Sequence, residues 1–395
     1  ERTAAMLKKS QRPLLHAGQG VKLSGARDLF VEMVEKYKLP FATTWNATDL
    51  IESDHDFFVG RPGAFAERGA NFAVQNADFY LALGTRLPFM VTGYNSTDFA
   101  RNAQRVVVDI DQTELDKATL DFHMKIQADA KAFLEALDLA LAGYKLEGSS
   151  WLDKCVEWRN KYPMVLDEYR TQETYVNAYY FVEQLSSNLD EGATVVTDMG
   201  LSFVGTHQAF QVKNGQRVFT NSGHAPMGWG LPAAIGACWA AGQRQTICLS
   251  GEGGLMMNIQ ELATVMHHQL PIKLFIYNNG GYLTIKQTQQ LGFEGRLMGS
   301  TVDSGISFPD FMETAKAYRI PYVRFEENGG MERGLHEFLQ APGSGICELM
   351  IDPDQPQVPK AINKRLPDGT TVPTTFEDLY PFLDEQELRA NMLQD

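Results

Sequence analysis

The chain has 395 residues, more than one hydrophobic core usually supports, and a hydrophobic content of 44%, so two well-packed domains are expected. Its formal net charge of -14 argues against nucleic acid and anionic membranes as partners, because both would be repelled. Four scattered cysteines without a CxxC pair, and the lack of a visible signal peptide or membrane-length apolar run, favour a reducing cytoplasm.

Strands and helices alternate over residues 1–145, which predicts a doubly wound α/β domain. An amphipathic helix is expected over 26–37, and strands are expected within 12–21 and over 40–44, 77–83 and 105–110. The edge at which parallel strands end would collect six residues, namely Gly18, Gly20, Thr44, Gly84, Arg86 and Asp109.

This edge suits a nucleotide, with glycines near a diphosphate and Asp109 at a ribose hydroxyl. The alternative is a set of plain turns, because a glycine follows the strand in most α/β folds. Both interpretations stay open from the residues alone.

Residues 146–172 lose the alternation and are interpreted as a linker with a surface helix over 151–162. A second α/β domain is expected over 173–358. Its first strand, 193–197, ends at Asp198-Met199-Gly200-Leu201-Ser202, which offers amides and a hydroxyl to a phosphate or forms an Asx-type turn. Met227, just before a small-residue helix, either supports an aromatic ring or is a core methionine.

The most informative stretch is 245–282, which predicts a βαβ unit. A strand over 246–249 ends at the loop 250–254, a helix follows over 255–268, and a strand over 272–277 ends at Asn278-Asn279-Gly280-Gly281. A right-handed crossover makes the two strands parallel, so Glu252 and Asn279 are expected at the same edge of the sheet.

These strand ends offer the groups that a metal diphosphate needs. Diphosphate binds backbone amides at a helix N-terminus where no Cβ atoms intrude, as in the loop Gly251 to Gly254. Mg²⁺ takes oxygen ligands, here the Glu252 carboxylate, the Asn279 amide oxygen and the Gly281 carbonyl. A plain βαβ unit whose glycines only make turns is the alternative.

After this unit, residues 287–303 are expected to form an active-site loop in which Gln287 meets substrate. A helix is expected over 308–318 and strands over 321–325 and 345–351. Residues 359–395 are interpreted as a C-terminal tail.

The spaced pair of motifs resembles a known signature. Gly-Glu-Gly at 251–253, a 24-residue spacer and Asn278-Asn279 resemble the thiamine diphosphate motif, which usually carries Asp where this chain has Glu252. The segments DMGLS, NSGHAPMGWGLPAAIGA, GEGGLMMNIQELAT and YNNGGY also match that family. Nearly the whole chain resembles the middle and C-terminal domains of the acetolactate synthase/pyruvate decarboxylase superfamily. The runs NNGGYLTIKQTQ, DSGISFPDF and RLPDGTTVPTTFEDLYPFLD look most like acetolactate synthase-like members of polysaccharide and deoxysugar gene clusters.

The resemblance implies decarboxylation of a 2-oxoacid, with pyruvate expected, and transfer of the acyl carbanion equivalent to a carbonyl acceptor. It implies that Met227 bends the cofactor and that the Ala225 carbonyl, where the family usually has Gly, accepts from the aminopyrimidine. The other expected cofactor contacts are Gly200, Leu201, Ser202, Gly251, Glu252, Gly253, Gly254, Asn279, Gly281 and Tyr282.

The middle domain resembles the one that holds FAD in acetohydroxyacid synthases and pyruvate oxidase. The residues at its contact positions are Gly18, Gly20, Thr44, Gly84, Arg86, Asp109 and Asp129. After Arg86 this chain has Leu-Pro-Phe, where flavin-binding relatives usually carry Asp and Arg. Several superfamily members keep this domain without flavin, so FAD stays an open expectation.

The resemblance also implies a partner. In this superfamily a pyrimidine-binding domain of another subunit supplies a glutamate, so a homodimer or tetramer is expected, with that domain supplied in cis by a longer protein or in trans by a separate chain. The alternatives are a fragment or non-catalytic regulatory homologue, and a flavin- or nicotinamide-dependent oxidoreductase.

Overall fold

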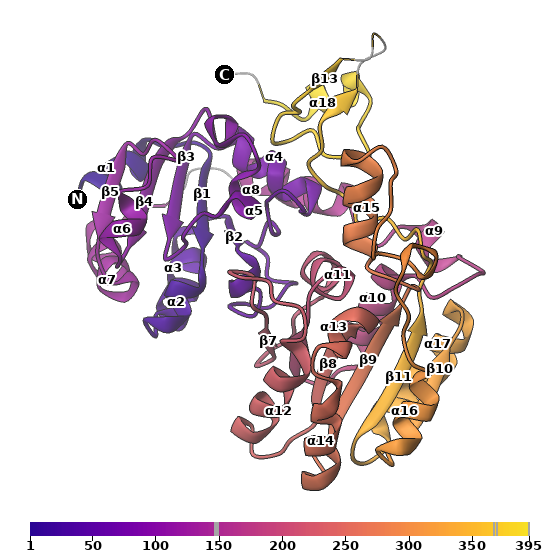
Figure 1. Ribbon diagram of the computed structural model, residues 1–395. Helices are drawn as coiled ribbons and strands as arrows, with labels where there is room; N and C mark the ends of the chain where they lie inside the picture. Colours follow the sequence, from indigo (N-terminus) through magenta and orange to yellow (C-terminus); the bar gives the residue numbers. More distant parts are fainter. Residues whose placement is uncertain (146–149, 366–367, 369, 394–395) are drawn as a thin grey trace. The chain divides into compact units, whose positions relative to one another are not determined.

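The computed structural model describes residues 1–145, 150–365, 368 and 370–393 (Figure 1). The chain divides into two compact units, Glu1–Pro163 with Val358–Asp395, and Met164–Gln357. Each unit contains one parallel sheet with helices on both faces. The predicted fold class, two doubly wound α/β domains, is therefore confirmed.

The sheet of the first unit has five parallel strands in the order β2-β1-β3-β4-β5. The strands are β1 (Pro13–Ala17), β2 (Phe41–Thr43), β3 (Phe79–Leu83), β4 (Gln104–Asp109) and β5 (Met124–Gln127). Every residue of β1 and β3 is buried, because helices cover both faces of the central strands. The sequence analysis did not find the edge strand β5, in which exposed Lys125 and Gln127 alternate with half-buried residues.

Helices of the first unit form two layers around this sheet. One hydrophobic cluster joins the sheet to α1, α3 and α7, and another joins it to α4 and α8. The α-helices are α1 (Arg2–Lys9), α2 (Gln19–Leu23), α3 (Arg27–Tyr37), α4 (Arg68–Asn76), α5 (Phe89–Thr92), α6 (Gln112–Leu115), α7 (Ala130–Ala140) and α8 (Ser150–Lys161). Two short 3-10 helices, η1 (Trp45–Ala47) and η2 (Ser96–Asp98), lie in the loops.

The expected linker is divided between the two units after Pro163, and the expected tail belongs to the first unit. Helix α8 lies in the region assigned to the linker, of which residues 146–149 are outside the described part, and its Trp151 Nε1 donates to the Pro13 carbonyl at 2.9 Å. The tail contains β12 (Lys364–Arg365), β13 (Thr371–Val372) and α18 (Glu385–Ala390). Arg68 of α4 donates to the carbonyls of Leu379 at 3.0 Å and Pro381 at 2.6 Å, which fastens the tail to this unit.

The sheet of the second unit has six parallel strands in the order β10-β11-β9-β8-β6-β7. The strands are β6 (Thr194–Thr197), β7 (Arg217–Phe219), β8 (Thr246–Gly251), β9 (Ile272–Asn278), β10 (Tyr322–Phe325) and β11 (Gly345–Met350). The sequence analysis found all of these except the short strand β7. Gly251 pairs with Tyr277, so the central strands β8 and β9 end level with each other.

Helices α10 and α17 cover one face of this sheet, and α12, α14 and α16 cover the other (Figure 1). The α-helices are α9 (Asp167–Arg170), α10 (Ala178–Asn188), α11 (Leu201–Ala209), α12 (Gly230–Ala240), α13 (Glu252–Met256), α14 (Leu262–His268), α15 (Leu283–Gly292), α16 (Phe311–Ala317) and α17 (Asn328–Gln340). The 3-10 helices are η3 (Ile259–Glu261) and η4 (Val302–Ser304).

Two sequence-based expectations in this unit were wrong in detail. The helix expected over 255–268 begins earlier, at Glu252, and breaks at Asn258, where φ is -139°. The Asn258 amide donates to the Gly228 carbonyl at 2.6 Å, so a tertiary hydrogen bond accompanies the break. The loop expected over 287–303 is helical as far as Gly292, because α15 runs through its first part.

None of the helices in the described ranges is long and apolar enough to cross a membrane.

Candidate cofactor and metal site

Three neighbouring strands of the second unit end at one edge of the sheet and carry polar side chains there. Asp198 follows β6, Glu252 follows β8, and Asn279 follows β9. Thr197 pairs with Leu249 and Gly251 pairs with Tyr277, so the three strand ends lie close together. The prediction that Glu252 and Asn279 share this edge is confirmed.

Glu252 joins the two glycine-rich loops directly. Its side-chain oxygen Oε1 accepts the backbone N–H of Asn279 at 3.0 Å and that of Gly281 at 2.8 Å. The residue is only 1% exposed, and burial raises the pKa of its carboxyl to about 7, although the backbone donors oppose the shift. A divalent cation at this edge would favour the ionised carboxylate.

Asp198 is a site residue whose side chain the sequence analysis did not single out. Its Oδ1 accepts from the backbone of Met199 at 2.9 Å and of Gly228 at 3.0 Å, and its Oδ2 accepts from the Ser250 hydroxyl at 2.8 Å. Burial raises the pKa of this carboxyl, and these donors oppose the shift. Asp198 therefore ties the end of β6 to β8 and to the loop before α12. The sequence signal that could have identified Asp198 is its position directly after the buried strand β6.

The glycines of the first loop differ in what surrounds them. A Cβ on Gly253 would come within 2.0 Å of the Tyr282 ring, and a Cβ on Gly254 within 2.5 Å of Asp198 Oδ2. Packing against neighbouring side chains therefore accounts for both glycines. A Cβ on Gly251 would meet nothing within 4 Å, so open space lies beside this residue.

The loop after β6 presents a helix N-terminus at the same edge. Gly200, with φ at 81°, caps the nine-residue helix α11, and Leu201 and Ser202 are its first residues. The Ser202 hydroxyl donates to the Met199 carbonyl at 3.1 Å, so it serves the turn. The first N–H groups of a helix have no acceptor within the helix, and they suit an anion.

Ala225 and Met227 lie in the loop between β7 and α12. Ala225 is exposed and has φ at +50°, a left-handed conformation in which glycine is favoured. Met227 is 41% exposed, so it is not the core methionine of the alternative interpretation. Its side chain is accessible to a ligand.

Beyond the second loop lies a cavity of about 190 Å³, lined by residues that include Asn279, Gly281, Lys286, Ser300 and Asp303. Lys286 on α15 pairs with Asp354 at 2.7 Å. The next residue, Gln287, donates through Nε2 to the carbonyl of Gln355 at 3.0 Å. Its side-chain amide therefore links α15 to the segment that follows β11. Contact between Gln287 and a substrate stays a prediction.

The described ranges contain no group of three or more His, Cys, Asp or Glu residues that would hold a metal ion. The predicted ligand set of Glu252, Asn279 and Gly281 instead combines one carboxylate with an amide oxygen and a carbonyl oxygen. These are hard ligands of the kind that Mg²⁺ accepts alongside water and substrate phosphates.

The corresponding edge of the first unit is packed more tightly. A Cβ on Gly18 would come within 2.2 Å of the Gly84 carbonyl oxygen, and a Cβ on Gly20 within 2.7 Å of the Gly84 Cα. The close approach of these two loops explains all three glycines. Gly18 also caps α2, and Thr44 caps η1.

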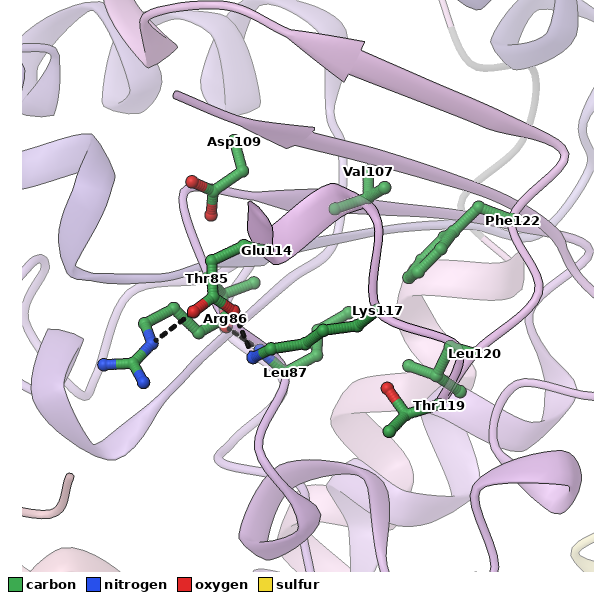
Figure 2. A pocket seen from close by; sticks show the side chains of 10 residues that line it. All are labelled: Thr85, Arg86, Leu87, Val107, Asp109, Glu114, Lys117, Thr119, Leu120 and Phe122. Carbon is green, nitrogen blue, oxygen red and sulfur yellow. Dashed lines mark hydrogen bonds and ion pairs between the residues drawn. The ribbon is translucent and has the colours of Figure 1, made fainter. Parts of the chain in front are cut away.

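Charged side chains fill the space beside these loops. Figure 2 shows Glu114 between Arg86 and Lys117, with ion pairs to both. The cavity lined by these residues and Asp109 has a volume of about 20 Å³, room for about one water molecule. Asp129 caps α7 by accepting from Lys131 and Ala132. The expectation of FAD therefore gains no support from the geometry of this edge.

Comparisons with known proteins match one family model to each of the two units. Residues 1–137 match the family model "Thiamine pyrophosphate enzyme, central domain", and residues 198–349 match "Thiamine pyrophosphate enzyme, C-terminal TPP binding domain". Together the two models include the three strand ends of the second unit and the glycine edge of the first.

Similar curated proteins are acetolactate synthase large subunits. The isozyme 2 large subunit of Escherichia coli K12 is 32% identical over 352 residues, which are 89% of this chain and 62% of that protein. The large subunit of Porphyra purpurea is also 32% identical, over 88% of this chain and 58% of its own length. A probable large subunit of Methanocaldococcus jannaschii is 29% identical, over 91% and 61% respectively. The chain thus spans about three fifths of the length of these relatives.

Proposed function

The chain belongs to the thiamine pyrophosphate enzymes, whose central and C-terminal domains it contains, and from this premise we propose an acetolactate synthase-like activity. The proposed reaction is decarboxylation of a 2-oxoacid, with pyruvate as the first candidate, and transfer of the acyl unit to a carbonyl acceptor. The observation that carries the proposal is the pair of hydrogen bonds from the loop Asn279–Gly281 to Glu252, because it brings the two motif segments together at one sheet edge.

The residues at this edge fit a magnesium diphosphate by their chemistry. Glu252, Asn279 and the Gly281 carbonyl would supply hard oxygen ligands to Mg²⁺. The N-terminus of α11 at Gly200 to Ser202 would supply N–H groups and a positive helix end to the diphosphate. The open space beside Gly251 leaves room for a group to approach the backbone closely.

Thiamine diphosphate would supply the carbon nucleophile that makes decarboxylation and acyl transfer accessible. The chain's own residues would bind and orient it. The exposed Met227 side chain would support the cofactor's rings, and the Ala225 carbonyl, on a left-handed residue, would accept a hydrogen bond from the aminopyrimidine. Asp198 would position these segments, because it accepts hydrogen bonds from Met199, Gly228 and Ser250.

The proposed active form includes a pyrimidine-binding domain, in the same longer polypeptide or in a partner chain, within a dimer or tetramer. The greater length of the relatives supports this part of the proposal. A non-catalytic homologue is the second candidate. It is favoured by Glu252 itself, because this longer acid already accepts two backbone N–H groups of the loop that follows β9.

Calorimetric titration with thiamine diphosphate, with and without Mg²⁺, tests cofactor binding by this chain. We expect binding heat that requires Mg²⁺ in the wild type and is lost in Glu252→Ala. Glu313→Ala, which removes an exposed acid of α16, is the matched control and should bind like the wild type. Absence of metal-dependent heat in the wild type would contradict the proposal.

Catalysis is tested separately. Addition of a pyrimidine-binding domain from an acetolactate synthase should produce carbon dioxide from pyruvate if the chain is catalytic. Metal-dependent binding without turnover would instead support the non-catalytic homologue.

A further inference from the structure

A cavity of about 270 Å³ lies beside the first residues of β9 and β11 and along β10 in the second unit. Since β9 rises about 3.3 Å per residue, Lys273 in the wall of this cavity is roughly 20 Å along the strand from Asn279. Residues of the strands, of α17 and of the turn after α17 line it, including Lys273, Val323, Phe325, Phe338 and Pro342. All of these belong to the second unit.

Lys273 is a buried cation at this cavity. It is the second residue of β9 and only 1% exposed, and its ammonium donates to the Ala341 carbonyl at 2.6 Å. The ammonium lies 5.2 Å from the centre of the Phe338 ring. In the part of the chain that the structure describes, no carboxylate pairs with it. An ammonium has three N–H donors, and among the described residues only the Ala341 carbonyl accepts from this one.

Burial of the Lys273 ammonium costs free energy. A buried charge loses its hydration, and one carbonyl replaces only part of it. Burial accordingly lowers the pKa of Lys273. An anion in the cavity would supply further acceptors and an opposite charge.

The rest of the wall is apolar and shaped by two glycines. A Cβ on Gly334 would come within 2.6 Å of the Phe325 ring, and a Cβ on Gly345 within 2.8 Å of the Phe338 ring. The two rings can therefore lie against backbone, with the cavity beside them. Glu337 also lines the cavity and is exposed, so its negative charge repels anions and disfavours a ligand with two negative charges more than a ligand with one.

We propose that this cavity binds a small monocarboxylate with an aromatic or branched apolar group. The carboxylate would accept from the Lys273 ammonium, and the apolar group would pack against Phe325 and Phe338. The site is separate from the candidate cofactor site, so it stands independently of the proposed function.

Calorimetry with phenylacetate and its neutral isostere phenylacetamide tests the proposal on the full chain. We expect phenylacetate to bind at least about tenfold more tightly, the order of one charge-assisted hydrogen bond. Lys273→Met, similar in length but uncharged, should remove this preference. Lys8→Met is the matched control, because Lys8 also donates to one backbone carbonyl but is exposed; it should leave the preference unchanged.

A second variant tests the proposal even if Lys273→Met does not fold. Glu337→Gln removes the rim charge and should tighten phenylacetate about twofold to fivefold without changing phenylacetamide, as expected for an exposed charge. Equal affinity for the two compounds, no binding of phenylacetate by the wild type, or an unchanged preference in Lys273→Met would each overturn the proposal.

Discussion

Glu252 Oε1 lies 2.8 Å from the backbone nitrogen of Gly281, so the acid at the end of one strand holds the loop at the end of the next. The same carboxyl accepts from Asn279 at 3.0 Å and is 1% exposed. Loop order and metal binding would therefore depend on one side chain. Two substitutions of Glu252 can separate the effect of its charge from the effect of its hydrogen bonds.

Glu252→Gln keeps the length of the side chain and one acceptor oxygen but removes the charge. We expect Mg²⁺-dependent binding of thiamine diphosphate to weaken at least about tenfold, with the free energy of unfolding changed by about 1 kcal/mol or less. Glu252→Ala loses both hydrogen bonds and should cost about 2–4 kcal/mol. Urea unfolding and calorimetric titration measure the two quantities. A Gln variant that binds as tightly as the wild type would rule out Glu252 as a metal ligand.

Gly254 and Gly251, in the same loop, should respond differently to alanine. A Cβ on Gly254 would come within 2.5 Å of Oδ2 of Asp198, whose carboxyl accepts from the Met199 and Gly228 backbones and the Ser250 hydroxyl. A Cβ on Gly251 meets nothing within 4 Å. We expect Gly254→Ala to lower the free energy of unfolding by about 1–3 kcal/mol, typical of overpacking, and Gly251→Ala to change it by less than about 0.5 kcal/mol. Chemical denaturation of the cofactor-free chain measures both, and equal losses would argue against the Asp198 contact.

The sequence predicted features that depend on local pattern. Apolar runs of four and six residues, followed by Ser250-Gly251 and by Asn278-Asn279, located β8 and β9. The right-handed crossover rule placed Glu252 and Asn279 at one edge. The alternation of strands and helices predicted the two doubly wound domains. The family signature supplied the spacing between the loops.

Features that depend on contacts between distant segments were not predictable in the same way. The break at Asn258 coincides with a hydrogen bond to Gly228, thirty residues earlier, and the helical pattern does not reveal it. Asp198 acquires its role from Ser250, which lies 52 residues away in sequence. The short strands β5 and β7 lie at sheet edges and lack a buried apolar run. In the first unit, Gly18 and Gly20 resembled a nucleotide loop but pack against Gly84.

Ala225→Gly should stabilise the chain. Ala225 has φ at +50°, which costs an alanine about 1–2 kcal/mol, while glycine pays about 0.5–1 kcal/mol in unfolded-state entropy. The expected net gain in the free energy of unfolding is about 0.5–1 kcal/mol. The residue is exposed, so no packing change obscures the result. Ala225→Val, with a β-branched side chain, is the opposite control and should lose about 1 kcal/mol or more. Destabilisation by glycine would show that the left-handed conformation is not populated.

A pH dependence of stability should originate in the first unit at His16. This histidine of β1 is fully buried, and its Nδ1 lies 2.6 Å from the Tyr80 hydroxyl. Burial lowers the pKa of His16 to about 3 from an ordinary value of 6.5. Between these values the unfolded chain binds a proton that the folded chain does not, so stability falls as the pH falls below about 6.5.

The expected loss from this group is about 2 kcal/mol between pH 7 and pH 5, since each pH unit below 6.5 contributes about 1.4 kcal/mol. The double variant His16→Phe/Tyr80→Phe replaces both hydrogen-bond partners with apolar rings of similar size and should remove this part of the slope. His336→Gln removes an exposed histidine of α17 and serves as the control. Urea unfolding curves at the two pH values measure the effect, and a double variant with the wild-type slope would assign the pH dependence to other groups.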